Sequence, residues 1–333
     1  MRPIGWTLAL VMLGASLPTW AQATPDFGAD LERFDYPYPV RWFETQAQGG
    51  AVRMAYLDVA PTAKANGRTV VLFHGKNFCA ATWGDTIRDL AGRGYRVLAP
   101  DQIGFCKSSK PAGFQYSFHA LAQLTEALLD QAGVGKGTLV GHSTGGVLAT
   151  RFALLHPDRV AQLVLVNPLG LNDTLAEGVP YTPLDKLRAE EAKTDRQSIK
   201  SYQQRVYYHG QWRPSYDRWV DMLAGQYASV DGATVREAQA RLSDMIETQP
   251  VAAELPQVNV PVTLIIGQKD KTAYRANTAP EGAQVRTVPQ AAETAVNAIP
   301  DARLIRLDAL GHAPMVEDPA AFHGALAKAL SPR

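Results

Sequence analysis

The chain has 333 residues, of which 46% are hydrophobic and 20% are charged, and its formal net charge is +1. This length suits one large α/β domain with an insertion, or two modest domains. Charges of both signs are spread along the sequence without a block of either. This distribution argues against a nucleic-acid partner and gives no basic patch for an anionic membrane surface.

The N-terminus has the layout of a secretory signal peptide. Arg2 precedes an apolar stretch at residues 4–17, and small residues stand at Ala21 and Ala23. The stretch is shorter than the roughly 20 residues that span a bilayer, so a membrane anchor is the weaker interpretation. We expect residues 1–23 to be removed and the mature protein to be periplasmic or secreted, without stable membrane insertion.

The mature region is expected to alternate between strands and helices. Two strands are expected at 40–44 and 51–59, and four continuous apolar runs follow at 69–73, 96–100, 137–141 and 162–168. Continuous apolar runs are typical of parallel strands that are covered on both faces. Helical patterns separate these runs and lie at 79–94, 117–133 and 145–160. This order predicts a parallel sheet built from right-handed crossovers.

A helical insertion interrupts this alternation. The sheet pattern resumes only at 260–270 and 302–312, and a helix at 319–330 closes the chain. The segment that interrupts it, residues 172–255, is rich in aromatic residues, namely Tyr181, Tyr202, Tyr207, Tyr208, Trp212, Tyr216, Trp219 and Tyr227. We expect a core formed by 24–171 and 256–333 around a cap formed by 172–255.

The sequence GHSTGG at 141–146 joins an expected strand to an expected helix and reads G-x-S-x-G around Ser143. A turn of one residue between strand and helix strains that residue and exposes its side chain, and Gly141 and Gly145 allow the two elements to pack closely. The N–H groups that follow, with the helix dipole, favour an oxyanion. We therefore expect Ser143 to be a nucleophile rather than an incidental serine in a glycine-rich turn.

A serine hydroxyl needs a base at neutral pH. Of seven histidines, His312 is the one that follows the last expected strand, from which a loop can reach Ser143. Asp270 follows the preceding strand and gives the order Ser, Asp, His along the chain. Asp173, which follows the strand expected at 162–168, is the second candidate for the acid.

Two backbone N–H groups are expected to form the oxyanion hole. One belongs to Thr144, directly after the nucleophile, and the other to Lys76 in the loop after the third strand, with Asn77 as the less favoured choice. The ammonium of Lys76 could face solvent or interact with an acidic substrate.

Taken together, these motifs resemble the α/β-hydrolase superfamily, in its cap-bearing branch of serine esterases, lipase-like enzymes and C–C bond hydrolases. The resemblance covers about residues 40–330 and rests on the motifs at 73–83, 99–111, 141–146, 163–171, 267–270 and 311–319. It implies an α/β fold with an eight-stranded, mostly parallel sheet, helices on both faces and a helical cap. The sequence has no histidine–carboxylate cluster with metal-ligand spacing and no phosphate-binding loop, so we expect hydrolysis without a cofactor or a metal. Epoxide hydrolases and haloalkane dehalogenases of this fold use an aspartate nucleophile and are disfavoured by Ser143.

The resemblance also bears on the two cysteines. The third and fourth strands are neighbours in this fold, which would place the loops of Cys79 and Cys106 side by side at the mouth of the active site. An oxidising compartment would allow these cysteines to form a disulfide. We predict that bond, and the alternative is a pair of partly buried free thiols.

The sequence thus predicts a carboxylesterase-like serine hydrolase that cleaves an ester or a related acyl compound through an acyl-enzyme. The cap should form one wall of the pocket, and its aromatics favour a small molecule with an apolar acyl or aromatic part. Cleavage of a C–C, lactone or amide bond by the same residues is the first alternative. A non-catalytic ligand receptor is the second, although a receptor has no need of Asp270. An interaction module is the third, although it gives no reason for a strained turn at Ser143.

Overall fold

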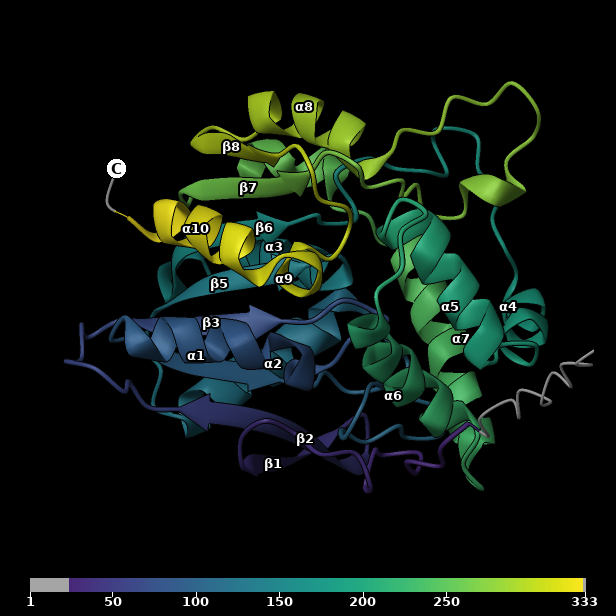
Figure 1. Ribbon diagram of the computed structural model, residues 1–333, viewed down its shortest axis with the longest axis horizontal. Coiled ribbons are helices and arrows are strands. Elements are labelled where there is room, and N and C mark those ends of the chain that lie inside the picture. Colours follow the sequence, from purple (N-terminus) through teal and green to yellow (C-terminus); the bar gives the residue numbers. More distant parts are fainter. Residues whose placement is uncertain (1–23, 332–333) are drawn as a thin grey trace, which may run out of the picture.

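A computed structural model describes residues 24–331, so the signal peptide expected at 1–23 lies outside the described residues. Eight strands form one sheet in the order β1-β2-β4-β3-β5-β6-β7-β8 (Figure 1). The strands are β1 (Val40–Ala47), β2 (Gly50–Val59), β3 (Thr69–Phe73), β4 (Arg96–Pro100), β5 (Gly137–His142), β6 (Val160–Val166), β7 (Val262–Gly267) and β8 (Ala302–Leu307).

The sheet is mostly parallel. β2 pairs antiparallel with both β1 and β4, and every pair from β4 to β8 in the sheet order is parallel. This strand order and pairing confirm the α/β-hydrolase architecture that the sequence motifs imply. Because the strands are parallel, the loops that follow them lie at one common edge of the sheet.

Helices cover both faces of the sheet. These core helices are α1 (Gly84–Gly92), α2 (Phe118–Gln131), α3 (Thr144–Leu155), α8 (Val288–Ala298), α9 (Pro314–Glu317) and α10 (Pro319–Leu330). In β3, Val71 and Phe73 pack in the core layer shared with α2, α3 and α8, whereas Val70 and Leu72 pack in the layer shared with α1 and α10. All four side chains are fully buried, which explains the continuous apolar run of this strand.

The remaining helices lie together at one end of the sheet, beyond the end of β3 (Figure 1). They are α4 (Leu184–Glu191), α5 (Arg196–Tyr202), α6 (Asp217–Tyr227) and α7 (Gly232–Thr248), with a short π-helical turn, η3 (Gln203–Tyr207), after α5. All of them fall within the segment that the sequence predicts to be a cap. The segment before β1 is attached to this group, since Phe27 N donates a hydrogen bond of 3.2 Å to Gly225 O of α6.

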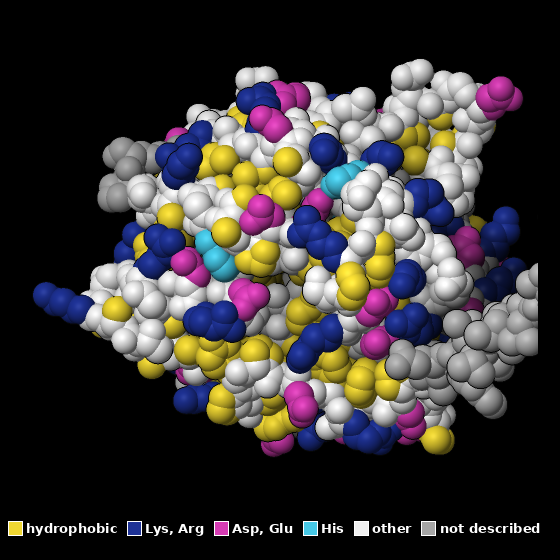
Figure 2. Space-filling view, in the orientation of Figure 1, with side chains coloured by type: hydrophobic (Ala, Val, Ile, Leu, Met, Phe, Trp, Pro, Cys, Tyr) yellow, Lys and Arg dark blue, Asp and Glu magenta, His cyan; other side chains and the backbone are white. Residues whose placement is uncertain are grey.

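Two helices differ from the sequence-based expectations. The helix expected at 145–160 ends at Leu155, because Pro157 follows and β6 begins at Val160. The sequence patterns considered above do not predict α8, which lies between β7 and β8. Within residues 24–331, no helix has the length and apolarity needed to cross a membrane. Figure 2 shows basic and acidic side chains intermixed over one face of the molecule.

A disulfide joins the loop after β3 to the loop after β4. Cys79 and Cys106 are bonded, with their Cα atoms 5.9 Å apart, which confirms the predicted pairing. Both residues are buried. The bond therefore restrains the loop that is expected to supply one oxyanion donor.

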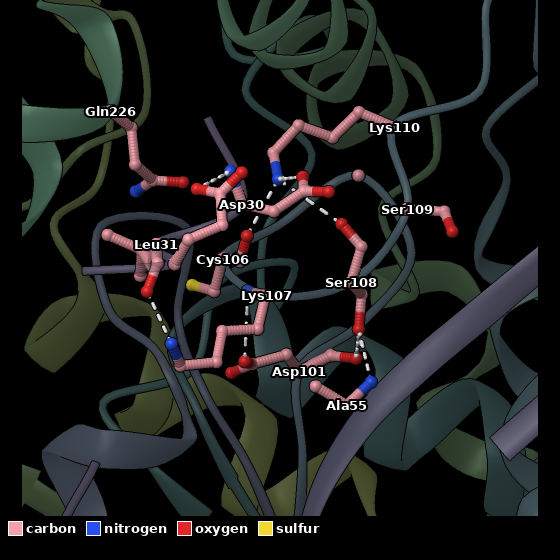
Figure 3. A network of polar contacts seen from close by, with 12 residues as sticks. Asp30, Leu31, Ala55, Asp101, Cys106, Lys107, Ser108, Ser109, Lys110 and Gln226 are labelled. Carbon is pink, nitrogen blue, oxygen red and sulfur yellow. Dashed lines mark hydrogen bonds and ion pairs between the residues drawn. The ribbon is translucent and has the colours of Figure 1, made fainter. Parts of the chain in front are cut away.

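A buried carboxylate reinforces the same connection. Asp101 is fully buried and accepts hydrogen bonds from Ala80 N (2.8 Å), the Tyr36 hydroxyl (2.6 Å) and Lys107 N (3.2 Å). The ammonium of Lys107 donates to the Leu31 carbonyl, and Figure 3 shows this side chain between Leu31 and Asp101. Asp101 thus ties the chain next to Cys79 to the N-terminal segment and to the loop after β4.

Replacing both cysteines, in a Cys79→Ala/Cys106→Ala variant, is expected to lower the free energy of unfolding by about 3 kcal/mol. The bond closes a loop between residues 27 apart in sequence, and its loss enlarges the conformational freedom of the unfolded chain. Urea unfolding of the oxidised protein and of the variant measures this difference. Wild-type protein kept in reductant should approach the variant. Equal unfolding midpoints for all three samples would contradict the prediction.

Candidate active site

Ser143 occupies a strained turn between β5 and α3. Its φ is 53° and its ψ is −119°, a backbone conformation that residues other than glycine rarely adopt. A Cβ atom at Gly141 would lie 2.3 Å from the Gly145 carbonyl oxygen, and one at Gly145 would lie 2.4 Å from the Phe73 carbonyl oxygen. Neither contact is tolerable, so both glycines are needed for the turn that presents Ser143 at the N-terminus of α3.

The structure brings His312 and Asp270 together. His312 Nδ1 lies 2.7 Å from Asp270 Oδ2, and both side chains are buried. A carboxylate can only accept here, so Nδ1 carries the proton and Nε2 is the basic nitrogen. Among residues 24–331, Nε2 is buried and has no hydrogen-bond partner. The ring is therefore oriented with an accepting nitrogen free.

Asp173 is placed elsewhere. Its Oδ1 accepts hydrogen bonds from Leu175 N (3.0 Å) and Ala176 N (3.2 Å) within its own turn. This is the ordinary role of an aspartate that follows a strand. Asp270 is therefore the carboxylate whose geometry suits the triad acid.

Asn167 orients the Asp270 carboxylate, and the sequence motifs did not identify it. Its Nδ2 donates to Asp270 Oδ2 over 2.8 Å, and its Oδ1 accepts from Gly267 N over 3.0 Å. On its other oxygen, Asp270 accepts a hydrogen bond of 2.7 Å from Thr272 N. The position of Asn167 directly after β6, beside the end of β7, is the sequence signal that could have identified it.

Tyr207 contacts His312 from the cap side, whereas the sequence placed it only among the aromatic residues of the cap. Its ring stacks on the His312 imidazole, with centroids 4.3 Å apart and planes at 27°. Its carbonyl oxygen accepts a hydrogen bond of 2.9 Å from His312 N, and its hydroxyl accepts one of 2.9 Å from Asn77 Nδ2. Tyr207 ends the π-helical turn η3, a type of turn that often occurs at functional sites and that helical periodicity does not predict.

His142, inside the GHSTGG motif, supports the His312 loop. Its Nε2 lies 2.8 Å from the His312 carbonyl oxygen and donates to it. Burial lowers the pKa of His142 well below 6.5, and the nearby His312 lowers it further. His142 is thus a neutral structural donor.

Stability is expected to fall as the pH drops from 7 to 5. Burial lowers the pKa of both His74 and His142 below 6.5, so the unfolded chain binds protons that the folded chain cannot. Their contribution to stability is fully present above the unfolded pKa and is lost below it, by up to about 1.4 kcal/mol per pH unit for each histidine. Urea unfolding over this pH range measures the slope, which His142→Gln should reduce. His119, an exposed histidine, is the control: His119→Gln should leave the slope unchanged. Equal slopes in all three proteins would contradict the account.

The loop after β3 runs directly beside Ser143. A Cβ atom at Gly75 would lie 2.9 Å from Ser143 Cβ, so the next residue, Lys76, enters the site at its wall. Lys76, Asn77 and Thr144 all line one cavity with Ser143. Thr144 is the first residue of α3, where backbone N–H groups have no partner within the helix. This arrangement suits the expected oxyanion donors.

From the sequence, the Lys76 ammonium was expected to face solvent or to interact with an acidic substrate. It donates instead to Glu191 Oε1 of α4 over 2.9 Å. The sequence could not show this pairing, because it depends on how the cap packs on the core.

The cavity has a volume of about 320 Å³, and its lining has more apolar than polar surface. Its aliphatic lining residues are Leu169, Ile199 and Leu223. Four tyrosines add ring surface together with hydroxyl groups: Tyr202, Tyr207, Tyr227 and Tyr274. Tyr208 and Tyr216, in contrast, stack on each other within the cap, with ring centroids 4.0 Å apart.

His74, Asp101 and Cys106 are close enough to suggest a metal site, with their ligand atoms within 4.8 Å of one another. Their donor atoms are already engaged, however. Cys106 is in the disulfide, Asp101 accepts backbone hydrogen bonds, and His74 Nε2 accepts one of 3.1 Å from Gln102 N. This group is better explained as a structural cluster behind the loop after β3.

Comparison with known proteins identifies the family of the chain. Residues 68–319 match the family described as the alpha/beta hydrolase fold, and the chain belongs to that family. A probable hydrolytic enzyme from Pseudomonas aeruginosa PAO1, known as a crystal structure, is 49% identical. The match covers 93% of this chain and 99% of the Pseudomonas aeruginosa chain, with a TM-score of 0.91. The chain therefore has the alpha/beta hydrolase fold.

Two curated relatives are more distant. A 2-hydroxy-6-oxo-2,4-heptadienoate hydrolase from Pseudomonas putida is 29% identical over 47% of this chain and 65% of its own length. Epoxide hydrolase A from Mycobacterium tuberculosis is 38% identical over 33% of this chain and 35% of its own. The chain thus matches less than two thirds of either protein. Their activities therefore do not identify the substrate here.

Proposed function

We propose that this protein is a serine hydrolase that cleaves a carboxylic ester of a small substrate through an acyl-enzyme. One observation carries the proposal. Asp270 orients a buried His312 so that His312 Nε2 has no hydrogen-bond partner and can accept a proton, and a strained turn presents the Ser143 hydroxyl. A receptor would gain nothing from a buried acid that orients a histidine.

The chemistry follows from these positions. Ser143 Oγ attacks the carbonyl carbon while His312 Nε2 takes its proton, and Asp270 stabilises the imidazolium. The carbonyl oxygen becomes an oxyanion that the N–H groups of Lys76 and Thr144 bind. His312 then gives its proton to the leaving alcohol, which leaves an acyl ester on Ser143. Water activated by His312 cleaves that ester and releases the acid.

Turnover of p-nitrophenyl acetate, butyrate and octanoate tests the proposal, beside labelling with a fluorophosphonate. We expect hydrolysis of at least one ester and a label on the protein. Labelling without turnover of any ester would favour C–C, lactone or amide substrates for the same residues. A folded protein that neither reacts with the probe nor hydrolyses an ester would overturn the proposal and favour a receptor.

We also propose that the protein is exported. The Cys79–Cys106 disulfide supports this, because such bonds persist in oxidising compartments. Fractionation of cells that express the full chain tests the idea. Recovery from the periplasm or medium, cleaved after Ala23, is expected. An uncleaved protein confined to the cytoplasm would contradict it.

A further inference from the structure

A buried ion pair bridges the core and the cap inside the pocket. Lys76 Nζ, on the loop after β3, donates to Glu191 Oε1, at the end of α4, over 2.9 Å. The two side chains are only 18% and 10% exposed. Both line the cavity that contains Ser143 and Thr144. A positive charge therefore stands on the same residue as one proposed oxyanion donor.

Glu191 is fixed in this position by further contacts from the cap. Its Oε2 accepts hydrogen bonds from the Tyr227 hydroxyl (2.8 Å) and the Thr194 hydroxyl (3.4 Å). Burial acts to raise the pKa of Glu191, but Lys76 and these hydroxyls outweigh it and hold the pKa below its ordinary value. The carboxylate is therefore charged at neutral pH and already satisfied by its neighbours.

The other charges of the cavity wall are paired as well. The charged residues that line the cavity are Lys76, Glu190, Glu191 and Arg275. Arg275 makes two hydrogen bonds of 2.9 Å to the Glu190 carboxylate. A charged substrate group would have to displace one member of a pair and leave it buried without a partner, which is costly. An uncharged group leaves both pairs intact.

We propose that Glu191 determines specificity by neutralising Lys76, so that the pocket accepts uncharged acyl groups and excludes carboxylates. The inference rests on the proposed hydrolysis at Ser143. Without Glu191, the Lys76 ammonium is an unpaired cation at the cavity wall and attracts an acyl chain that ends in a carboxylate. Glu191 would thus separate this protein from the P. putida relative, whose heptadienoate substrate carries that group.

Two esters of the same shape test the inference. The p-nitrophenyl ester of succinamic acid ends in an uncharged amide, and the mono-p-nitrophenyl ester of succinic acid ends in a carboxylate. We expect wild-type kcat/KM to favour the amide by about tenfold or more. Glu191→Gln keeps the size of the side chain and should lower that preference by about tenfold. Lys76→Met leaves Glu191 as an unpaired negative charge and should raise the preference for the amide ester. Glu293→Gln is the matched control, because Glu293 pairs with Arg306 on the surface, and its preference should equal that of wild type.

The outcomes separate a role in specificity from a merely structural link between core and cap. If wild type shows no preference, or if Glu191→Gln changes both rates by one common factor, the inference is wrong. Should Glu191→Gln fail to fold, Lys76→Met decides alone, and an unchanged preference in it overturns the inference. Hydrolysis of neither ester, nor of p-nitrophenyl butyrate, by folded wild type would overturn the proposed function. Hydrolysis without discrimination by charge would overturn only the role of Glu191.

Discussion

Replacing Ser143 with alanine is expected to lower kcat/KM for p-nitrophenyl butyrate by about 10⁴-fold or more. The change removes the one hydroxyl raised by the turn between β5 and α3, and with it the acyl-enzyme route. Losses of this size follow when a nucleophile that acts together with a base is removed, and the remaining rate comes from the oxyanion hole and substrate binding. Steady-state rates of the purified variant and of wild type measure the effect.

Ser243→Ala is the matched control. Ser243 lines the same cavity from α7 and is also buried, so Ser243→Ala removes a hydroxyl from the same pocket without altering the turn between β5 and α3. We expect kcat/KM within about threefold of wild type, because the Ser243 hydroxyl has no role in the proposed chemistry. Similar losses in both variants would show that the pocket, and not the nucleophile, had been damaged. Full activity of Ser143→Ala would contradict the mechanism.

Replacing Asp270 with asparagine is expected to lower kcat by about 10⁴-fold while the fold stays intact. Asp270 accepts hydrogen bonds from His312, Asn167 and Thr272 N. An asparagine amide cannot accept all of them, because one of its ends is itself a donor. The imidazole then loses both its fixed tautomer and the negative charge that stabilises its protonated form. Single-turnover and steady-state kinetics measure the loss, and circular dichroism establishes that the variant is folded.

Asp173→Asn distinguishes the two candidate acids. Asp173 accepts hydrogen bonds only from backbone N–H groups of its own turn among the contacts described above, and an asparagine oxygen can accept the same bonds. We expect activity close to that of wild type. A large loss at Asp173 together with a small one at Asp270 would reverse the assignment.

Much of the fold was predictable because local pattern and tertiary role coincide. The apolar run of β3 is continuous since both faces of the strand are covered. The glycines around Ser143 are required by backbone atoms that lie within 2.4 Å of any added Cβ. Their spacing therefore reports the turn directly. The disulfide was predictable once the order of neighbouring strands was known from the resemblance.

The missed features depend on contacts between segments that are distant in sequence. Asn167 matters because β6 ends beside β7, and Tyr207 because a π-helical turn brings a cap residue onto His312. The pairing of Lys76 with Glu191 spans 115 positions in sequence and follows only from the packing of the cap. No periodicity in a single segment encodes such contacts.

The most direct test of the central claim is to trap the acyl-enzyme. Wild-type protein mixed with excess p-nitrophenyl acetate and quenched in acid within milliseconds is digested and analysed by mass spectrometry. We predict one added acetyl group on the peptide that contains Ser143, formed at the rate of the initial burst of p-nitrophenol and absent from Ser143→Ala. Hydrolysis without an adduct on that peptide, or an adduct at another residue that forms and decays at the turnover rate, would contradict the mechanism.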